Sequence, residues 1–286
     1  VRGVLGSVVD AVCVIALVAG TVGPIGFLAT QVSFGFHELF GMADGYGTQL
    51  IIMAVLGAVY VTSAVTGIDR GIQILSRFNV MLAMAIAAVI LLFGPTLFLV
   101  DAWFQGFGSY LGSFFEMATM TAQTAPGWWM KWWTVFFFAW FIGFAPPMAI
   151  FVTRISRGRT IREMIIATAV LAPIVTTVWF TLLGGSGIFY ELQGAIDLSQ
   201  PLQNFQFDVA TLTVAQALPG GTWMALAILV LTTIFVATTG DSMSYAVSVV
   251  CAGNDDPGSA LRAFWGIVFA LMAAILLGMG EGQVSV

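Results

Sequence analysis

A long apolar stretch that runs directly into a basic turn is compatible with few folds. Residues 132–152 read WWTVFFFAWFIGFAPPMAIFV, and residues 153–163 read TRISRGRTIRE. In a membrane protein such an apolar run crosses the bilayer, while the arginines beyond its end remain in the cytoplasm. Most residues from Trp132 to Phe144 are Trp or Phe. This surplus of aromatic rings predicts a ligand as well as a membrane span.

Composition places the whole chain in a bilayer. The 286 residues are 59% hydrophobic and 8% charged, with a mean hydropathy of +1.00, whereas soluble domains are about 25% charged. We therefore predict an all-α integral membrane protein surrounded by membrane lipids. The net charge of −5 gives no sign of a nucleic-acid partner. Because the first residue is Val and the chain ends GEGQVSV, we expect an internal fragment of a longer protein.

Seven apolar stretches have the length of a membrane span, about 20 residues. They are residues 5–30, 48–67, 78–100, 132–153, 164–187, 222–250 and 260–279. Residues 103–127 combine Phe and Met with Glu116, Gly and Thr, which predicts an amphipathic helix lying along one membrane face. The links 31–47 and 188–221 are polar.

Positive charge falls on one side of this arrangement. With seven spans, eight of the nine basic residues share a side, and the exception is Lys131. The eight are Arg2, Arg70, Arg77, Arg154, Arg157, Arg159, Arg162 and Arg262. The opposite side holds mostly acids, namely Glu38, Asp44, Asp101, Glu116, Glu191, Asp197, Asp208 and Glu281. The positive-inside rule then predicts a multi-pass protein of the inner (cytoplasmic) cell membrane, with its first residue cytoplasmic and its last residue external.

Metal, redox and catalytic chemistry find little support in the sequence. Cys13 and Cys251 lie far apart in or at the end of apolar runs, which is typical of packing residues. The single histidine, His37, stands beside Glu38 in a polar link and is interpreted as a loop residue. No nucleotide loop, catalytic triad or metal-ligand helix signature occurs in the sequence. We therefore predict neither an enzyme nor a bound cofactor.

Three spans contain residues that can break a membrane helix. The first has Pro24 among glycines, the fourth has Pro146 and Pro147, and the sixth has Gly240 beside Asp241. Proline removes one backbone hydrogen bond, and glycine permits unwinding. We predict broken helices at these points, because in transporters the freed carbonyls line a cavity and coordinate ions or substrate.

Trp140, Phe141 and Phe144 are the candidate ligand-binding aromatics. At positions i, i+1 and i+4 of a helix, Trp140 and Phe144 share a face and Phe141 lies about 100° away. The faces of aromatic rings carry negative charge density, and each good contact with a quaternary ammonium gains about 0.5–2 kcal/mol. The alternative is that these rings only pack against neighbouring helices or lipid.

Polar side chains in the sixth span suggest an ion site. Asp241 is the only acid deep within that span. It either organises an ion site with Thr238 and Thr239 or caps broken backbone around Gly240. Hydroxyl and carbonyl oxygens suit a hard cation such as sodium. Thr21 supplies a hydroxyl in the first span, although a threonine in a membrane helix can instead bond to its own turn.

Taken together, these motifs resemble the betaine/carnitine/choline transporter family. WTVFFFAWFIGFAPPMAIFVTRISRGRTIRE is similar to the family's eighth membrane helix and following loop, and GIQILSRFNV, TTVWFTLLGGSG, ALPGG and TTGDSMS support the match. The resemblance covers the fifth to eleventh of twelve helices. It implies one transmembrane domain with part of a fold of two inverted five-helix repeats. Residues 1–100 would end the first repeat, 101–131 would form an external amphipathic link, and 132–286 would begin the second.

The resemblance also implies a substrate class. Family members import trimethylammonium-type compatible solutes, many by sodium symport and some by exchange, and a homotrimer is implied. Three tryptophans of the eighth helix contribute to a cage for the substrate's ammonium group. The matching positions here are Trp140, Phe141 and Phe144, so two of the three depart from the pattern. Phe has a weaker ring face than Trp but can still contact a trimethylammonium or dimethylsulfonium head, so these residues do not single out carnitine, choline or glycine betaine.

Sodium sites are implied on the same basis. The matching residues of the family's tenth helix are Phe235, Thr238 and Thr239, and the other half of that site lies in a helix that this chain does not include. A second family site uses two threonines and an aromatic residue. Only Thr21 fits that pattern, because Leu17 and Pro147 occupy the other positions. We therefore expect at most one sodium site.

The resulting hypothesis is a secondary transporter that imports a betaine-, carnitine- or choline-like solute by alternating access, coupled to a cation. Two alternatives stay open at this point. One is a solute exchanger of the same family, and the other is a membrane sensor that binds solute without moving it. A seven-helix photoreceptor is disfavoured, because a retinal Schiff base needs a lysine within a late helix and Lys131 sits at a span boundary.

Overall fold

The computed structural model describes residues 3–43, 45–66, 69–125, 127–204, 206–254 and 257–279. These ranges contain only helices and the turns that join them, which confirms the all-α fold class. The long helices are α1 (Val4–Phe40), α2 (Tyr46–Thr66), α3 (Asp69–Phe93), α4 (Thr96–Ala118), α6 (Phe137–Ile155), α12 (Thr222–Ala252) and α13 (Ser259–Met279). The short helices are α5 (Gly127–Trp129), α7 (Ile161–Ile165), α8 (Ala172–Phe180), α9 (Ser186–Leu192), α10 (Ser199–Gln203) and α11 (Phe207–Ala217). Three π-helical segments are η1 (Met130–Phe136), η2 (Ile166–Leu171) and η3 (Thr181–Gly185).

Six helical segments in the described ranges are long and apolar enough to cross a membrane. They are Gly6–Phe40, Tyr46–Ser63, Ile74–Phe93, Ile161–Leu192, Thr222–Ala252 and Ser259–Met279. The remaining predicted span, 132–153, is helical as well, since it is formed by η1 and α6. Several predictions concern residues or side chains outside the described set, and these are Arg2, Asp44, Arg70, Phe144, Pro146, Pro147, Arg154 and Glu281.

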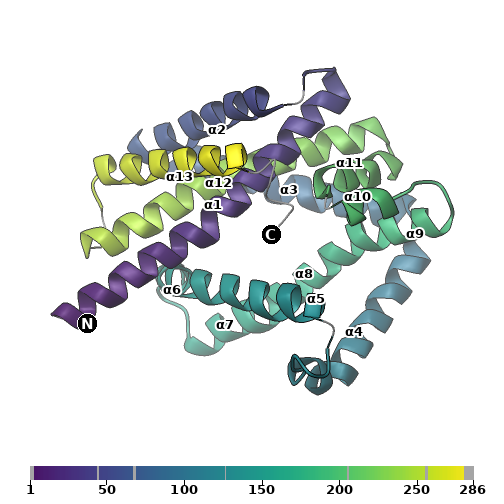
Figure 1. The fold of residues 1–286 in the computed structure, drawn as a ribbon, viewed down its shortest axis with the longest axis horizontal. Helices are drawn as coiled ribbons and strands as arrows, with labels where there is room; N and C mark the ends of the chain where they lie inside the picture. Colours follow the sequence, from purple (N-terminus) through teal and green to yellow (C-terminus); the bar gives the residue numbers. More distant parts are fainter. Residues whose placement is uncertain are drawn as a thin grey trace.

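The helices form two groups on either side of α1 (Figure 1). Helices α2, α12 and α13 pack along α1 and against one another, and α3 packs against α12. On the other side of α1, helices α4 to α8 form the second group, with α6 packed directly against α1. α1 therefore connects the main bundle with the aromatic helix α6.

The predicted breaks at Pro24 and Gly240 are wrong. Helices α1 and α12 continue without interruption through these residues, and α6 continues through Pro146 and Pro147. A proline is tolerated in a membrane helix when neighbouring helices support the freed backbone, and α1 is enclosed by α6, α12 and α13. Irregular helix occurs instead in η1, η2 and η3. η2 lies just before Pro173, whose ring and missing N–H disfavour a regular α-turn at that point.

The first predicted link is also largely helical. α1 extends to Phe40, so His37 belongs to the last turn of the helix and the loop interpretation is wrong. The Nδ1 atom of His37 lies 2.6 Å from the carbonyl oxygen of Met42. The helix ends at Gly41, whose φ of 68° is left-handed and therefore favours glycine.

The third predicted span ends earlier than residue 100, and the amphipathic helix begins earlier than residue 103. Gly94 and Pro95 separate α3 from α4, because proline disfavours a helical conformation in the residue before it. The link 188–221 is likewise not a simple loop, since it contains the end of α9 together with α10 and α11. At the start of α10, the side chain and backbone of Ser199 donate hydrogen bonds to Asp197, which lower the pKa of that carboxyl group.

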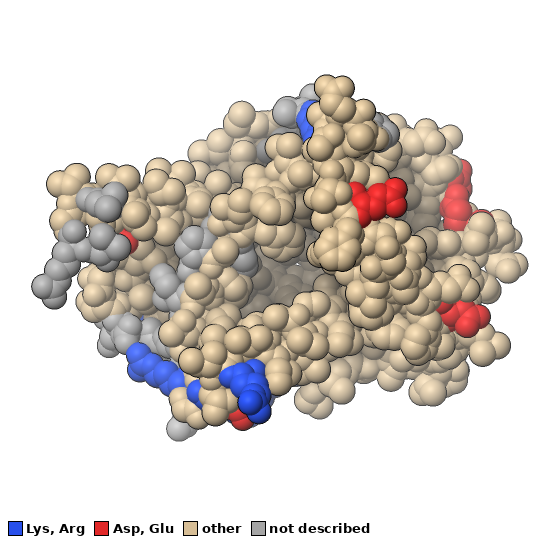
Figure 2. All heavy atoms as spheres, turned by 90° about the horizontal axis from the view of Figure 1, so that it is seen from below, with Lys and Arg blue, Asp and Glu red and all other residues tan. Residues whose placement is uncertain are grey.

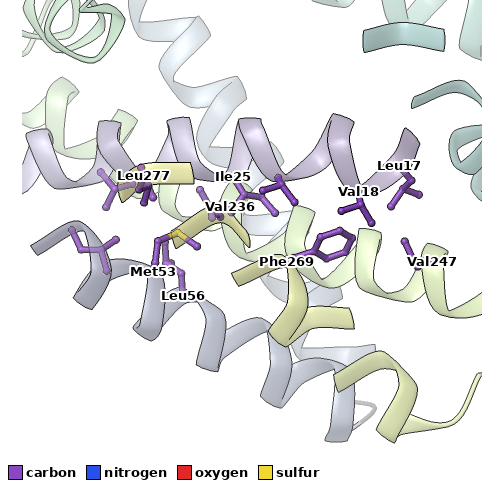
Figure 3. Packing of buried hydrophobic residues seen from close by; sticks show 14 of the residues in the cluster. Leu17, Val18, Ile25, Met53, Leu56, Val236, Val247, Phe269 and Leu277 are labelled. Atoms are coloured by element: carbon purple, nitrogen blue, oxygen red, sulfur yellow. The ribbon is translucent and has the colours of Figure 1, made fainter. Parts of the chain in front are cut away.

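The main core lies where α1, α2, α12 and α13 meet (Figure 3). Its buried residues include Leu17, Val18, Ile25, Met53, Leu56, Val236, Val247, Phe269 and Leu277. A second cluster joins α3, α4, η3, α11 and α12, with Ile86, Ile90, Leu99, Leu182 and Leu231 among its members. In lipid the surroundings are as apolar as these side chains, so such contacts stabilise the fold through close van der Waals packing.

Phe269 offers a test of this packing. Its side chain is fully buried (0% exposed) in the main core, whereas Phe264 on the same helix is 55% exposed. Replacing a buried Phe by Ala costs about 3–5 kcal/mol in packed cores. We expect Phe269→Ala to lower the thermal denaturation temperature of the full-length protein by about 3–4 °C, and Phe264→Ala to shift it far less. Equal shifts for the two variants would contradict the assignment of Phe269 to the core.

The basic turn predicted after the aromatic stretch connects α6 with α7. α7 begins at a capping box, in which Thr160 and Glu163 exchange side-chain and backbone hydrogen bonds. Figure 2 shows most of the basic side chains of the visible face gathered at its lower left and most of the acidic side chains toward the right, with one further basic group at the top. This separation is the distribution that the predicted membrane orientation requires, and the orientation itself stays a prediction.

Candidate functional site

The predicted site residues lie on three helices that contact one another. Thr21 is on α1, Trp140 is on α6, and Thr238 is on α12. α1 packs against both other helices, and α6 also contacts α12. The fold thus brings together helices whose candidate residues are about a hundred residues or more apart in the sequence (Figure 1). Among the described residues, no hydrogen bond or ring contact joins these three side chains directly.

Trp140 belongs to a ladder of rings along η1 and α6. Its ring lies parallel to that of Phe137, at a centroid distance of 6.3 Å and an interplanar angle of 5°. It meets the ring of Phe136 edge-on at 5.4 Å. Residues three and four apart share a helix face, so the ladder follows from the spacing of the aromatics. These contacts hold the half-buried Trp140 ring in one orientation, as a cation-binding ring requires.

Phe141 differs from Trp140 in its exposure. Its side chain is 67% exposed, and its ring stacks on Phe137 at a centroid distance of 6.4 Å. An exposed ring on this helix is open to a ligand, to lipid or to another helix, so the lipid or packing alternative stays open for Phe141. The prediction for Phe144 concerns a side chain outside the described residues, although its backbone belongs to α6.

The hydroxyl groups on α12 retain capacity to bind a cation. Thr238 Oγ1 donates to the carbonyl oxygen of Ile234 at 2.9 Å and lies 3.2 Å from that of Phe235. Its proton is thus directed along its own helix, and the oxygen lone pairs are left to accept. Thr239 is half-buried, and its hydroxyl makes no hydrogen bond to another described residue. The side chain of Phe235 contains no oxygen, so only its backbone carbonyl offers a hard ligand atom.

Asp241 follows Thr238 by three residues, about one turn of helix, and Thr239 by two residues. Its side chain is half-buried, and the backbone of α12 is regular from Phe235 to Tyr245. The alternative that Asp241 caps broken backbone around Gly240 is therefore wrong, because no break exists there. Its prediction as an organiser of an ion site stays untested.

Thr21 is buried, and its hydroxyl has no hydrogen-bond partner among the described residues. The side chain is 1% exposed. This differs from the expected bond to its own helical turn, and an unpartnered buried hydroxyl costs about 1–3 kcal/mol. Leu17, one turn earlier, is buried in the main core and offers no oxygen. The neighbourhood of Thr21 therefore contains one of the two hydroxyls that the resemblance implied for a second sodium site.

Tyr60 on α2 is a residue that sequence reasoning missed. It is one of the largest fully buried side chains, and its hydroxyl donates to the carbonyl oxygen of Gly266 on α13 at 3.2 Å. A signal was present, because a tyrosine in the middle of the apolar run AVLGAVYVTSAV has to find a partner for its hydroxyl. Its position relative to Gly240 makes it relevant to the residues on α12.

Comparison with known proteins identifies a family with similar sequences. Residues 1–285 match the profile of the betaine/carnitine/choline family transporters. The chain is 41% identical over 285 residues to glycine betaine transporter 2 of Vibrio parahaemolyticus, covering 100% of the chain and 52% of the relative. It is 29% identical to a glycine betaine transporter of Bacillus subtilis (98% of the chain, 54% of the relative). An ectoine/hydroxyectoine transporter of Virgibacillus pantothenticus is 28% identical (96% of the chain, 54% of the relative). The chain thus spans about half the length of these relatives.

Proposed function

Because this chain belongs to the betaine/carnitine/choline family of transporters, we propose that the full-length protein imports a small quaternary-ammonium or related compatible solute by secondary active transport. The observation that carries the proposal is the packing of the aromatic helix α6 against α1 and α12, the two helices with candidate ion ligands. The predicted class of protein, a transporter rather than an enzyme, is confirmed at the level of the family. Glycine betaine is the first substrate to test, because it names the relatives from Vibrio and Bacillus.

The rings of Trp140, Phe141 and Phe144 would receive the ammonium head of the solute. A quaternary ammonium is large and weakly hydrated, so ring faces can replace its water at little cost, with about 0.5–2 kcal/mol gained per good contact. The stacking of Trp140 on Phe137 supports this role, because a ring that is already fixed loses little entropy when it binds. The same surface would accept a sulfonium or a delocalised cation, which keeps ectoine-like solutes within the proposal.

Coupling to sodium would use Thr238 and Thr239 together with the carbonyl oxygen of Phe235. The Thr238 proton already points to backbone carbonyls, so its oxygen can face a cation without losing a bond. A ligand shifts a conformational equilibrium only by the difference between its affinities for the two states. Sodium held on α12 would favour the arrangement of helices that binds solute, and this differential affinity is what symport by alternating access needs.

The wider setting is part of the same proposal. The full-length protein would be a homotrimer in the inner (cytoplasmic) membrane, with residue 1 on the cytoplasmic side and residue 286 outside. Residues 1–100 would end one inverted repeat, and residues 132–286 would begin the other. The charge separation in Figure 2 supports this orientation. Labelling of single cysteines at 158 and 194 from each side of the membrane tests it, because these positions should react from opposite sides.

Transport by the full-length protein in liposomes tests the function. Uptake of radiolabelled glycine betaine would be measured with and without an inward sodium gradient. We expect accumulation that requires the gradient. Accumulation only against preloaded solute would establish an exchanger, and binding without accumulation would establish a sensor. Uptake of ectoine or choline but not of glycine betaine would support the proposal of a transporter and would assign it a different substrate.

Thr21 provides a test of the number of sodium sites. Because Leu17 supplies no oxygen beside it, we expect Thr21→Val to leave the sodium concentration for half-maximal uptake unchanged within about twofold. Removal of an unpartnered buried hydroxyl should leave the free energy of unfolding unchanged or raise it by about 1 kcal/mol. Thr30→Val is the control, since Thr30 lies on the same helix and its hydroxyl is bonded to Phe27. A tenfold loss of sodium affinity confined to Thr21→Val would establish a second site.

A further inference from the structure

Tyr60 occupies the junction of α2, α12 and α13. These three helices pack against one another, and the Tyr60 side chain is 1% exposed between them. Its hydroxyl donates a hydrogen bond of 3.2 Å to the backbone carbonyl oxygen of Gly266. Tyr60 thus belongs to α2, its hydrogen-bond acceptor belongs to α13, and its ring lies against α12 at Gly240.

Gly240 leaves room for the Tyr60 ring. A Cβ atom added at Gly240 would lie 2.7 Å from Cδ1, 2.9 Å from Cε1 and 3.0 Å from Cγ of Tyr60. Non-bonded carbon atoms have an optimal separation of about 3.5–4.0 Å, so the ring of Tyr60 would have to move. On the other side, a Cβ at Gly266 would lie 2.9 Å from Val61 Cγ2 and 3.5 Å from Tyr60 Cε2. The ring is thus fitted between two helix backbones.

The contact at Gly240 lies directly beside the proposed ion ligands. Gly240 follows Thr239 and precedes Asp241 in an unbroken stretch of α12. At about 100° per residue, Gly240 faces about 160° away from Thr238 and about 100° away from Thr239. Tyr60 therefore contacts α12 on the side opposite Thr238. Because a regular helix moves as a unit over one turn, fixing Gly240 fixes the depth and rotation of both threonines.

We propose that Tyr60 is a positioning residue, which holds α12 in the register that presents Thr238 and Thr239 to the coupling ion. The inference rests on the proposed sodium site for its functional consequence. It does not require Tyr60 to touch the ion or the solute. The phenol ring sets the distance between α2 and α12, and the hydrogen bond to Gly266 sets the position of the ring along α13.

The test is the sodium dependence of uptake by full-length variants in liposomes. We expect Gly240→Ala to raise the sodium concentration for half-maximal uptake about tenfold, with the maximal rate within about twofold of wild type. Tyr60→Phe keeps the ring and loses the hydrogen bond, so a rise of about threefold is expected. Gly26→Ala is the matched control, because its added Cβ would meet Ala273 and Leu277 at an ordinary 3.8 Å. Equal sodium affinity in all four proteins would overturn the inference, as would a lower maximal rate at unchanged sodium affinity.

Steric origin is checked by a second substitution. In the Gly240→Ala background, Tyr60→Leu removes the ring that the new methyl group meets. If contact carries the effect, the double variant should recover a sodium affinity within about threefold of Tyr60→Leu alone. Additive losses in the double variant would instead show that the two positions act independently.

A third readout separates failure of this inference from failure of the sodium proposal. A single cysteine introduced as Thr239→Cys, with other cysteines replaced, reports the position of α12 through its rate of reaction with a thiol reagent. We expect Gly240→Ala and Tyr60→Phe to change this rate at least threefold, and Gly26→Ala to leave it unchanged. This measurement needs no sodium. If wild-type uptake is independent of sodium, the ion site is wrong, and the labelling rate still decides whether Tyr60 positions α12.

Discussion

Replacing Trp140 by alanine in the full-length transporter is expected to abolish saturable glycine betaine uptake while leaving the amount of protein in the membrane unchanged. Each ring contact with an ammonium group contributes about 0.5–2 kcal/mol, or up to about 30-fold in affinity. The change also removes the stack on Phe137 and the edge contact with Phe136. The solute would lose one ring contact, and the neighbouring rings of Phe136 and Phe137 would lose the ring that they pack against.

Phe138→Ala is the matched control for this substitution. Phe138 lies on the same helix, is 65% exposed, and faces about 160° away from Trp140. Its removal takes an aromatic ring from a surface that is not part of the proposed cage. We expect wild-type uptake for this variant. Loss of uptake in both variants would assign the aromatic helix a structural role, and unchanged uptake in Trp140→Ala would remove the cage proposal.

Conservative substitutions at Trp140 refine the same test. Trp140→Phe keeps a ring with a weaker face, so the solute concentration for half-maximal uptake should rise while uptake stays saturable. Trp140→Leu keeps an apolar side chain without a ring and should behave like alanine. This order, Trp above Phe above Leu, is the one that an ammonium–ring contact predicts. An apolar packing contact would rank Leu close to Phe.

Membrane spans were the most predictable part of the fold, because length and hydropathy alone define them. The predicted boundaries of 222–250 and 260–279 lie close to those of α12 and α13. Boundaries failed where helix formation continued beyond the apolar run. The segment 31–40 is less apolar than the residues before it, yet it forms nearly three further turns of α1. Polarity marks the edge of the lipid, whereas a helix ends where a residue such as Gly41 stops it.

Proline and glycine were poor guides to broken helices. Pro24 and Gly240 were predicted to interrupt α1 and α12, and both helices are continuous. The reason differs between the two positions. A proline costs one hydrogen bond, which the surrounding helices can compensate. Gly240 serves close packing, since the ring of Tyr60 occupies the space where a Cβ would lie. Sequence alone does not show which helix will approach a glycine.

Candidate site residues could be chosen from the sequence, but their proximity could not. Trp140 and Thr238 are separated by nearly a hundred residues, and the packing of α6 on α1 and α12 brings their helices together. Nothing in the local pattern of either helix encodes that contact. The choice of site residues came from the family resemblance. The match to the family profile confirms the family and does not test the individual residues.

Substituting Thr238 by alanine is expected to raise the sodium concentration for half-maximal uptake at least tenfold, which corresponds to about 1.4 kcal/mol. The hydroxyl donates its proton to Ile234, so removing it costs one local hydrogen bond as well as the proposed ligand oxygen. Thr233→Ala controls for the local bond, because the Thr233 hydroxyl donates to Leu229 on the same helix at 2.8 Å. Thr233→Ala should leave sodium dependence unchanged.

Thr238→Ser separates the oxygen from the methyl group of the same side chain. A serine retains the ligand atom and the bond to the preceding turn, so its sodium dependence should stay within about threefold of wild type. Loss of affinity in Thr238→Ser equal to that in Thr238→Ala would assign the effect to packing of the methyl group. Unaltered sodium dependence in Thr238→Ala would remove this ion site altogether. The coupling ligand would then have to be sought among the remaining oxygens on this helix, first at Asp241, because an intramembrane carboxylate is retained only where a cation, a proton or water stabilises it.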